Sequence, residues 1–226
     1  MLIECKNLQK TYLIEGRPVA AVDNVNLAVK EGDFVVILGH SGSGKTTLLS
    51  LIGGLTTPDS GQVFINGIDN WQQTDNSLSN IRNKKIGFIF QFASLIPTLT
   101  TLENILLPLS FSRKPSGSRE EALAMLDRVG LADKANAFPS QLSGGQQRRV
   151  AISRAFINKP DIILADEPTG DLDEFTERDI LSLFREYNEK GITFLIVTHN
   201  VLLAEKQKRA RVFIMRQGVL VEQASE

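Results

Sequence analysis

The chain has 226 residues, which is enough for one compact domain with a well-buried core. Its 25 basic and 26 acidic side chains nearly cancel, leaving a formal net charge of -1. This balance provides no global field that would attract nucleic acid or an anionic membrane, so any such partner must be met through a local surface. We expect no nucleic-acid partner.

The N-terminal residues point to a protein of the cytoplasm. Charged and amide side chains occur from the fourth residue on, which is not the pattern of a secretory signal. No apolar run approaches the roughly 20 residues of a membrane span. The single cysteine, Cys5, cannot form an internal disulfide, and its apolar neighbours predict a buried, inert thiol.

Apolar runs and helical patterns alternate along the chain. Residues 2–8 and 19–29 predict strands, and the continuous apolar run at residues 34–38 is typical of a strand buried on both faces. Similar runs occur at residues 162–165 and 192–197, with a helical pattern at residues 174–187 between them. This alternation predicts an α/β fold with a mainly parallel sheet.

Residues 101–129 show two helical stripes and no strong strand, which predicts a helical lobe inserted in the α/β core. Pro108 is expected to kink or end the first helix, and Gly130 can cap the second.

A phosphate-binding loop is the strongest motif. Residues 39–46 read GHSGSGKT, directly after a buried strand and before a helical run, which matches the G-x-x-x-x-G-K-[ST] pattern. Its glycines let successive backbone N–H groups point at anionic oxygens, Lys45 supplies a charge to the β and γ phosphates, and Thr46 can ligate Mg²⁺. The predicted ATP contacts of this loop are Gly39, His40, Ser41, Gly42, Ser43, Gly44, Lys45, Thr46 and Thr47, with His40 contributing no side-chain chemistry.

Two later strand ends carry polar side chains that a phosphoryl-transfer site needs. Asp166 and Glu167 follow the strand at residues 162–165, and His199 follows the strand at residues 192–197. The carboxyl ends of parallel strands gather at one edge of a sheet, so these groups are expected near the phosphate loop. One carboxylate can hold Mg²⁺ and the other can orient or deprotonate the attacking water.

The segment QLSGGQQRRVAISRAF at residues 141–156 resembles the signature of ATP-binding-cassette (ABC) ATPases. A serine and two glycines at a helix start make a second anion site. The resemblance covers essentially the whole chain as a single ABC ATPase domain. It implies an α/β P-loop NTPase fold with a mainly parallel core sheet, an antiparallel β subdomain near the N-terminus, and a helical subdomain at about residues 92–158.

The resemblance also implies a head-to-tail homodimer. In that arrangement Ser143, Gly144, Gly145 and Gln146 of one subunit cover the γ phosphate of ATP on the other subunit. A Cβ on either glycine would hold the backbone away from that phosphate. ATP and Mg²⁺ are then the expected cofactors.

Further positions match the family residue by residue. Tyr12 resembles the aromatic residue that stacks on adenine, and Gln91 the glutamine that reaches Mg²⁺ and the attacking water. Asp173 resembles the aspartate of the interface loop, His199 the histidine that contacts the γ phosphate, and Glu167 the catalytic glutamate. Asp166 then joins Thr46 and Gln91 as a magnesium ligand. Asp171 departs from the family, because many relatives carry asparagine there.

Residues 91–110 look most like cassettes of the lipoprotein-release and macrolide- or peptide-export group. The resemblance implies a separate polytopic permease, with this chain attached peripherally to the cytoplasmic face of the membrane. The candidate permease contact is the apolar surface formed by Phe92, Leu95, Ile96 and Leu99.

Other ABC classes remain as alternatives. Cassettes that act on DNA ends or chromosomes separate the two halves by long coiled coils, whereas Lys45 and Ser143 are close in this sequence. Cassettes that act on ribosomes carry two copies in one chain, and this chain has one. A cassette that regulates a cell-wall enzyme complex through a membrane protein has the same sequence features.

Overall fold

The computed structural model describes residues 1–112, 116–170, 172–205, 207 and 209–223. A six-stranded sheet forms the centre of the molecule, with strand order β10-β9-β3-β8-β7-β6. All neighbouring strands in it are parallel except β9 and β10, which pair antiparallel. Its strands are β3 (Phe34–Leu38), β6 (Ile86–Ile89), β7 (Ile162–Asp166), β8 (Thr193–Thr198), β9 (Arg211–Arg216) and β10 (Val219–Glu222).

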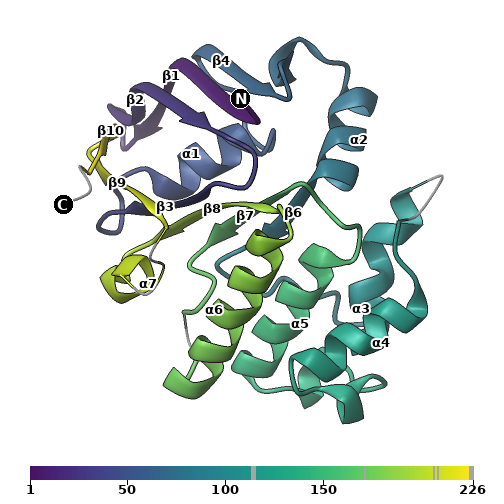
Figure 1. The fold of residues 1–226 in the computed structure, drawn as a ribbon. Coiled ribbons are helices and arrows are strands. Elements are labelled where there is room, and N and C mark those ends of the chain that lie inside the picture. The colour runs from purple at the N-terminus through teal and green to yellow at the C-terminus, as the bar shows by residue number, and fades with distance from the viewer. Residues whose placement is uncertain (113–115, 171, 206, 208, 224–226) are drawn as a thin grey trace.

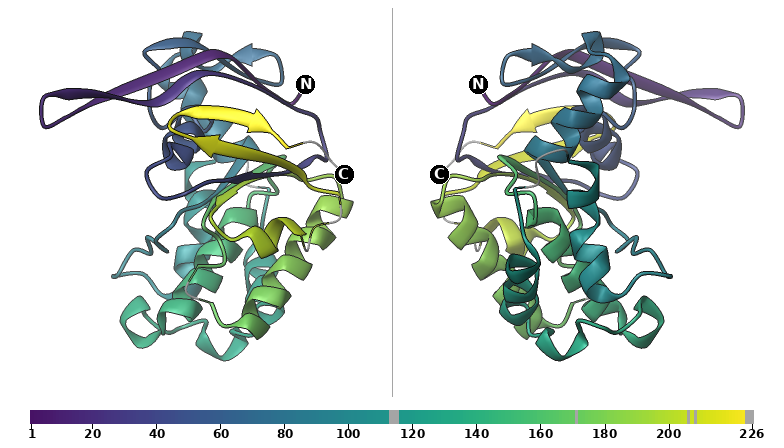
Figure 2. Two further views of the ribbon diagram at one scale, coloured as in Figure 1. Left: turned by 90° about the vertical axis from the view of Figure 1, so that its left-hand side faces the viewer. Right: turned by 90° about the vertical axis from the view of Figure 1, so that its right-hand side faces the viewer.

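An antiparallel sheet with the order β2-β1-β4-β5 lies beside the central sheet. It comprises β1 (Ile3–Ile14), β2 (Arg17–Val29), β4 (Ser60–Ile65) and β5 (Ile68–Asp69). The hairpin of β1 and β2 is longer than the sequence predicts and extends beyond the body of the molecule (Figure 2).

Seven α-helices are assigned in the described residues. They are α1 (Lys45–Ile52), α2 (Asp75–Lys85), α3 (Thr101–Leu106), α4 (Arg119–Arg128), α5 (Gly144–Phe156), α6 (Glu174–Glu189) and α7 (Val201–Glu205). Short 3₁₀ turns are η1 (Asn70–Gln72), η2 (Leu107–Phe111), η3 (Ala132–Lys134) and η4 (Pro139–Gln141). As predicted, α3 ends before Pro108, and Gly130 takes a left-handed conformation (φ 68°) just after α4.

Each face of the central sheet packs into its own core. Phe34 and Val36 of β3 face the cluster that includes α3 to α6, whereas Val35 and Ile37 face the cluster that includes α1 and the antiparallel sheet. Figure 1 shows these layers, with α1 and the antiparallel sheet on one side and α5 and α6 on the other. β3, β7 and β8 consist almost wholly of apolar residues because both of their faces are buried. The predicted fold class is confirmed.

No α-helix in the described part of the chain is both long and apolar enough to cross a bilayer.

Candidate functional site

Three strand ends meet at one edge of the central sheet. Leu38, the last residue of β3, lies opposite Thr198, the last residue of β8. Asp166, the last residue of β7, lies opposite Val197 of β8. The register therefore brings the phosphate loop, the acidic pair and the histidine segment to one edge, as parallel α/β sheets do with ligand groups.

The phosphate loop runs from β3 to α1 and depends on its glycines. Gly42 and Gly44 have φ angles of 77° and 105°, which side-chain-bearing residues rarely adopt. A Cβ on Gly44 would lie 1.9 Å from the Ala21 carbonyl oxygen of β2, and one on Gly39 would lie 2.5 Å from the Met215 carbonyl oxygen of β9. β2 and β9 therefore pack closely against the outside of the loop, where only glycine fits.

The inside of the loop has the groups that an anion requires. The Lys45 ammonium donates to the carbonyl oxygens of Gly39 (2.7 Å) and His40 (3.0 Å), so this buried charge lies across the loop. The Ser43 hydroxyl is buried and has no hydrogen-bond partner among the described residues. A phosphate oxygen would satisfy it, so the loop fits a nucleotide phosphate. His40 and Ser41 are exposed, and Thr47 is half-buried.

Thr46 and Asp166 lie together although 120 residues separate them. The Thr46 hydroxyl donates to Asp166 Oδ2 at 2.7 Å. Burial raises the pKa of the Asp166 carboxyl, and the neighbouring Glu167 adds to this. The hydrogen bond from Thr46 and the charges of Lys45 and Arg148 act in the opposite direction. A cation placed beside these two oxygens would favour the ionised carboxylate.

Glu167 is held in one orientation by the residues that follow β8. Its Oε2 accepts from the Thr198 hydroxyl at 2.6 Å, and its Oε1 accepts from the His199 backbone N–H at 3.0 Å. The His199 ring Nδ1 lies 2.8 Å from the same Oε1. Glu167 itself has a φ of 45°, an uncommon conformation for a side-chain-bearing residue. The carboxylate is mostly buried, whereas the imidazole is 73% exposed.

Gln91 lies just after β6 and has an exposed side chain. Its carbonyl oxygen accepts from the Arg148 guanidinium, which also binds the Phe90 carbonyl oxygen. Arg148 is 4% exposed and lies on α5, so it ties the helix that follows the signature to the glutamine segment. The motif analysis did not single out Arg148. Its position one helical turn before Ile152, on the buried face of α5, was the available signal.

The signature residues form the N-terminus of α5. Ser143 is the N-cap, and its hydroxyl accepts from the Gln146 N–H while Gln146 Oε1 accepts from the Ser143 N–H. This reciprocal capping gives the Gln146 side chain a role within its own chain. A Cβ on the exposed Gly144 would meet nothing within 4 Å. Packing within the described chain therefore does not explain glycine at this position.

The start of α5 lies at the end of the helical lobe that is remote from the sheet (Figure 1). The phosphate loop, in contrast, lies at the sheet edge. The phosphate loop at the start of α1 and the signature at the start of α5 thus lie at separate places in the structure. The structure does not bring Ser143, Gly144, Gly145 and Gln146 together with the other predicted site residues.

Asp173 is the N-cap of α6, where its carboxylate accepts from the Thr176 N–H at 2.9 Å and from the Thr176 hydroxyl at 2.6 Å. These hydrogen bonds lower the pKa of the Asp173 carboxyl. Asp173 thus caps α6 within its own chain, and its role at a dimer interface stays a prediction. Asp171 lies outside the described residues.

Tyr12 lies on the long β hairpin with 39% of its side chain exposed. It pairs with Val19, and Lys10 of the same strand pairs with Val22. Ala21, which presses on the phosphate loop, lies between these two partners. Tyr12 is therefore on β1, next to the strand that packs against the loop, and the Lys10 ammonium lies over its ring, 5.6 Å from the centroid.

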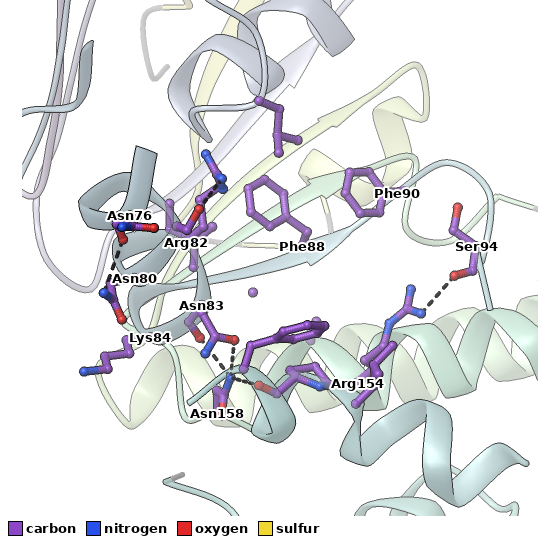
Figure 3. Close-up of a pocket in the computed structure, with 18 residues that line it drawn as sticks. Asn76, Asn80, Arg82, Asn83, Lys84, Phe88, Phe90, Ser94, Arg154 and Asn158 are labelled. Atoms are coloured by element: carbon purple, nitrogen blue, oxygen red, sulfur yellow. Dashed lines mark hydrogen bonds between the residues drawn. The ribbon is translucent and has the colours of Figure 1, made fainter. Parts of the chain in front are cut away.

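A groove of about 1110 Å³ lies beside β6, the edge strand of the central sheet. Residues of α2 form one wall, and residues of η2 and the end of α5 form the other. Between them lie Phe88 and Phe90, whose rings stack with centroids 5.5 Å apart (Figure 3). Phe90 is 40% exposed and Phe111 on the rim is 70% exposed, so apolar surface is open to a partner.

The predicted permease surface is divided in the structure. Phe92 and Ile96 are exposed, at 77% and 41%. Leu95 and Leu99 are half-buried, and Leu95 packs against the core. Phe92 and Ile96 belong to the segment that also supplies Phe90 and Ser94 to the groove.

Comparison with known proteins identifies the family. The ABC transporter family model matches residues 22–170. The lipoprotein-releasing system ATP-binding protein LolD of Syntrophus aciditrophicus is 42% identical over 92% of this chain and 95% of its own length. The macrolide export ATP-binding/permease protein MacB of Syntrophobacter fumaroxidans is 42% identical over 97% of this chain, which spans only 31% of that relative.

A third relative links the sequence to solved structures. The uncharacterized ABC transporter ATP-binding protein MJ0796 of Methanocaldococcus jannaschii is 48% identical over 92% of this chain and 91% of its own length. The dimeric structure of this cassette in a post-hydrolysis state, bound to ADP and Pi, superposes with a TM-score of 0.91 at 43% identity, covering 99% of this chain and all of that one.

A second dimeric structure of MJ0796 gives a TM-score of 0.91 at 44% identity, with the same coverage.

The fold and the loop at residues 39–46 define a P-loop nucleotide-binding domain. The chain belongs to the ABC transporter family as an ATP-binding cassette, and it is an ATPase.

Proposed function

We propose that the chain is the motor subunit of an ABC transporter, which dimerises head to tail on ATP and drives a separate membrane permease in export, lipoprotein release or mechanotransmission. The observation that carries this proposal is the hydrogen bond between Thr46 and Asp166, next to the hydrogen-bonded cluster of Glu167, Thr198 and His199. One edge of the sheet therefore has both the phosphate loop and the Glu167 carboxylate, whose orientation is fixed by hydrogen bonds.

Glu167 is placed to act on the attacking water. Its carboxylate accepts a proton as the water oxygen bonds to the γ phosphorus and the bond to the bridging oxygen breaks, releasing ADP and phosphate. The Thr198 hydroxyl fixes the carboxylate's orientation. Nδ1 of His199 lies 2.8 Å from Glu167 Oε1, which leaves Nε2 as the ring nitrogen available to the γ phosphate.

The donor set fits Mg²⁺. A hydroxyl and a carboxylate 2.7 Å apart, from Thr46 and Asp166, are hard oxygen ligands, and Gln91 offers an amide oxygen. When bound, Mg²⁺ neutralises charge on the phosphate oxygens and the leaving group. Thr46 and Asp166 orient one another before any ligand arrives.

Dimerisation explains the two separate helix starts. The open space over Gly144 and the exposed N-terminus of α5 suit an approaching phosphate. A second copy can bring its own loop-bound ATP to this surface, and two-fold symmetry then forms both sites at once. The dimeric structures reported for MJ0796 support this arrangement.

The permease is the partner that we assign to the groove beside β6. Exposed Phe90 and Phe111 offer apolar surface for a segment of a membrane protein, and Phe92 and Ile96 lie on the adjoining segment. The names of LolD and MacB relate to lipoprotein release and macrolide export, which supports a role in that group. The chain would then sit on the cytoplasmic face of the membrane.

Glu167→Gln tests the enzymatic half of the proposal. The amide keeps the shape of the side chain but cannot accept the proton, so turnover should fall at least about a hundredfold while ATP binding persists. Size-exclusion chromatography with ATP should then show an accumulated dimer. Turnover near the wild-type rate, or a monomer at saturating ATP, would contradict the proposal.

Purification from gently solubilised membranes tests the partner. A polytopic membrane protein should co-purify in a fixed ratio, and loss of ATP binding through Lys45→Ala provides a control for function-dependent assembly. Recovery only with nucleic acid or ribosomes would replace the transporter by a soluble ABC factor.

A further inference from the structure

The segment from Thr198 to Asn200 holds both oxygens of the Glu167 carboxylate. The Thr198 hydroxyl donates to Oε2 at 2.6 Å, and the His199 backbone N–H donates to Oε1 at 3.0 Å. The position of this segment therefore sets the position of the carboxylate, and a contact that fixes the segment also orients Glu167.

The backbone of Asn200 directs the proton of the Thr198 hydroxyl. Its N–H donates to the Thr198 hydroxyl oxygen at 3.0 Å. An N–H group can only donate, so the oxygen accepts there and its own proton points to Glu167. Thr198 is 1% exposed, so water competes little for these two bonds. The bond to the carboxylate thus depends on where the backbone of Asn200 lies.

The side chain of Asn200 fixes that backbone at two points. Its Oδ1 accepts from the Leu202 N–H at 3.0 Å, at the start of α7. Its Nδ2 donates to Glu177 Oε1 on α6 at 3.2 Å. Asn200 and Glu177 are both half-buried. The second bond links the segment after β8 to a helix that is distant from it in the sequence.

Glu177 lies in the first turns of α6, and its N–H donates to the carbonyl oxygen of Asp173 at 2.8 Å. Asp173 is the N-cap of this helix and the predicted interface residue. A continuous chain of hydrogen bonds therefore runs from the start of α6 to the reactive carboxylate, through Asp173, Glu177, Asn200, Thr198 and Glu167.

From this chain of hydrogen bonds we infer that Asn200 is a positioning residue for Glu167, and that its bond to Glu177 makes the orientation of the carboxylate depend on the start of α6. A second copy that docks against Asp173 and shifts the first turn of α6 changes the carboxylate along this path. The inference rests on the proposed function, because Glu167 is the carboxylate that Asn200 orients.

Asn200→Asp tests the bond with almost no change of shape. The new side chain still accepts from the Leu202 N–H, but it turns a carboxylate oxygen toward Glu177 in place of a donor. The two like charges repel, so we expect kcat to fall at least about tenfold while the KM for ATP changes less than about twofold. Because binding persists, size-exclusion chromatography with ATP should show an accumulated dimer.

A second substitution on α6 separates this bond from a general effect of charge. In Asn200→Asp/Glu177→Gln the amide donates to the carboxylate, so the hydrogen bond returns with its direction reversed, and kcat should recover to at least about half of the wild-type value. In the matched control, Asn200→Asp/Asp179→Asn, the same helix loses an exposed carboxylate outside the chain of bonds, and kcat should stay low.

Thermal unfolding midpoints report whether each variant folds. If Asn200→Asp lowers the midpoint, Asn200→Ala replaces it, because it removes both side-chain bonds and adds no charge. The expected result is again a lower kcat at an unchanged KM.

Four outcomes would overturn the inference: a wild-type kcat in Asn200→Asp and Asn200→Ala, a loss of ATP binding that matches the loss of kcat, no recovery with Glu177→Gln, or equal recovery with Asp179→Asn. Each of them leaves the proposed function intact. If Glu167→Gln itself hydrolyses ATP at the wild-type rate, the proposed function fails. The two failures are therefore distinguishable.

Discussion

Thr198 shows how a single hydroxyl prepares the reactive carboxylate. It donates to Glu167 Oε2 at 2.6 Å and accepts from the Asn200 N–H at 3.0 Å. Thr198→Val keeps the shape but removes both bonds, so the carboxylate loses its fixed orientation. We expect kcat to fall roughly 10- to 100-fold, as for the loss of a hydrogen bond to a charged group. Steady-state ATPase assays measure this effect.

Thr198→Ser keeps the hydroxyl and is the matched control, with at least half of the wild-type rate expected. A fully active Thr198→Val would show that the hydrogen bond has no part in turnover.

Cys5 illustrates the opposite extreme, a group protected from chemistry. It is 2% exposed on β1, and burial, with a smaller contribution from Glu4, raises the pKa of its thiol from 9.0 to about 12. The thiolate is the reactive form, so at pH 8 the folded protein has about a thousandfold less of it than the unfolded chain. Ellman's reagent should therefore label Cys5 only on unfolding, and rapid labelling of the native protein would contradict its burial.

At the scale of elements, the sequence predicts what depends on local pattern. Apolar runs located β3, β7 and β8, and Pro108 and Gly130 marked helix ends. The pattern did not reveal α2, because Leu78 is its one buried residue and its periodicity is weak. It also could not reveal the hydrogen bond between Thr46 and Asp166, because that contact depends on tertiary packing. The same holds for the hydrogen bonds from Arg148 to the carbonyl oxygens of Phe90 and Gln91.

The N-terminus of α5 provides a test at this scale. Gly144→Ala adds a methyl group in open space at a helix start, so the unfolding midpoint should stay the same or rise slightly. If a partner's phosphate approaches this surface, the methyl group should lower ATP turnover at least about tenfold. Calorimetry and ATPase assays measure the two effects separately.

Gly130→Ala is the control, because it should lower stability and leave ATP turnover unchanged. Its left-handed φ of 68° makes alanine cost about 1 kcal/mol of stability, whereas turnover of the folded protein should persist. Normal turnover of Gly144→Ala would remove the reason for assigning α5 to the composite site.

The loop at α1 and the start of α5 lie at different ends of the molecule. In the proposed dimer they are the two halves of one site, so the specific ATPase activity of the isolated chain should depend on its concentration. Well below the dimer dissociation constant the rate should rise with the square of chain concentration, and it should become linear once dimers dominate.

Measurement at saturating ATP, with inert carrier protein to hold total protein constant, isolates this effect. A specific activity that stays constant across dilutions at which ultracentrifugation finds only monomers would mean that one chain contains a complete site. The start of α5 would then need another explanation, because packing within the described residues does not account for glycine at position 144.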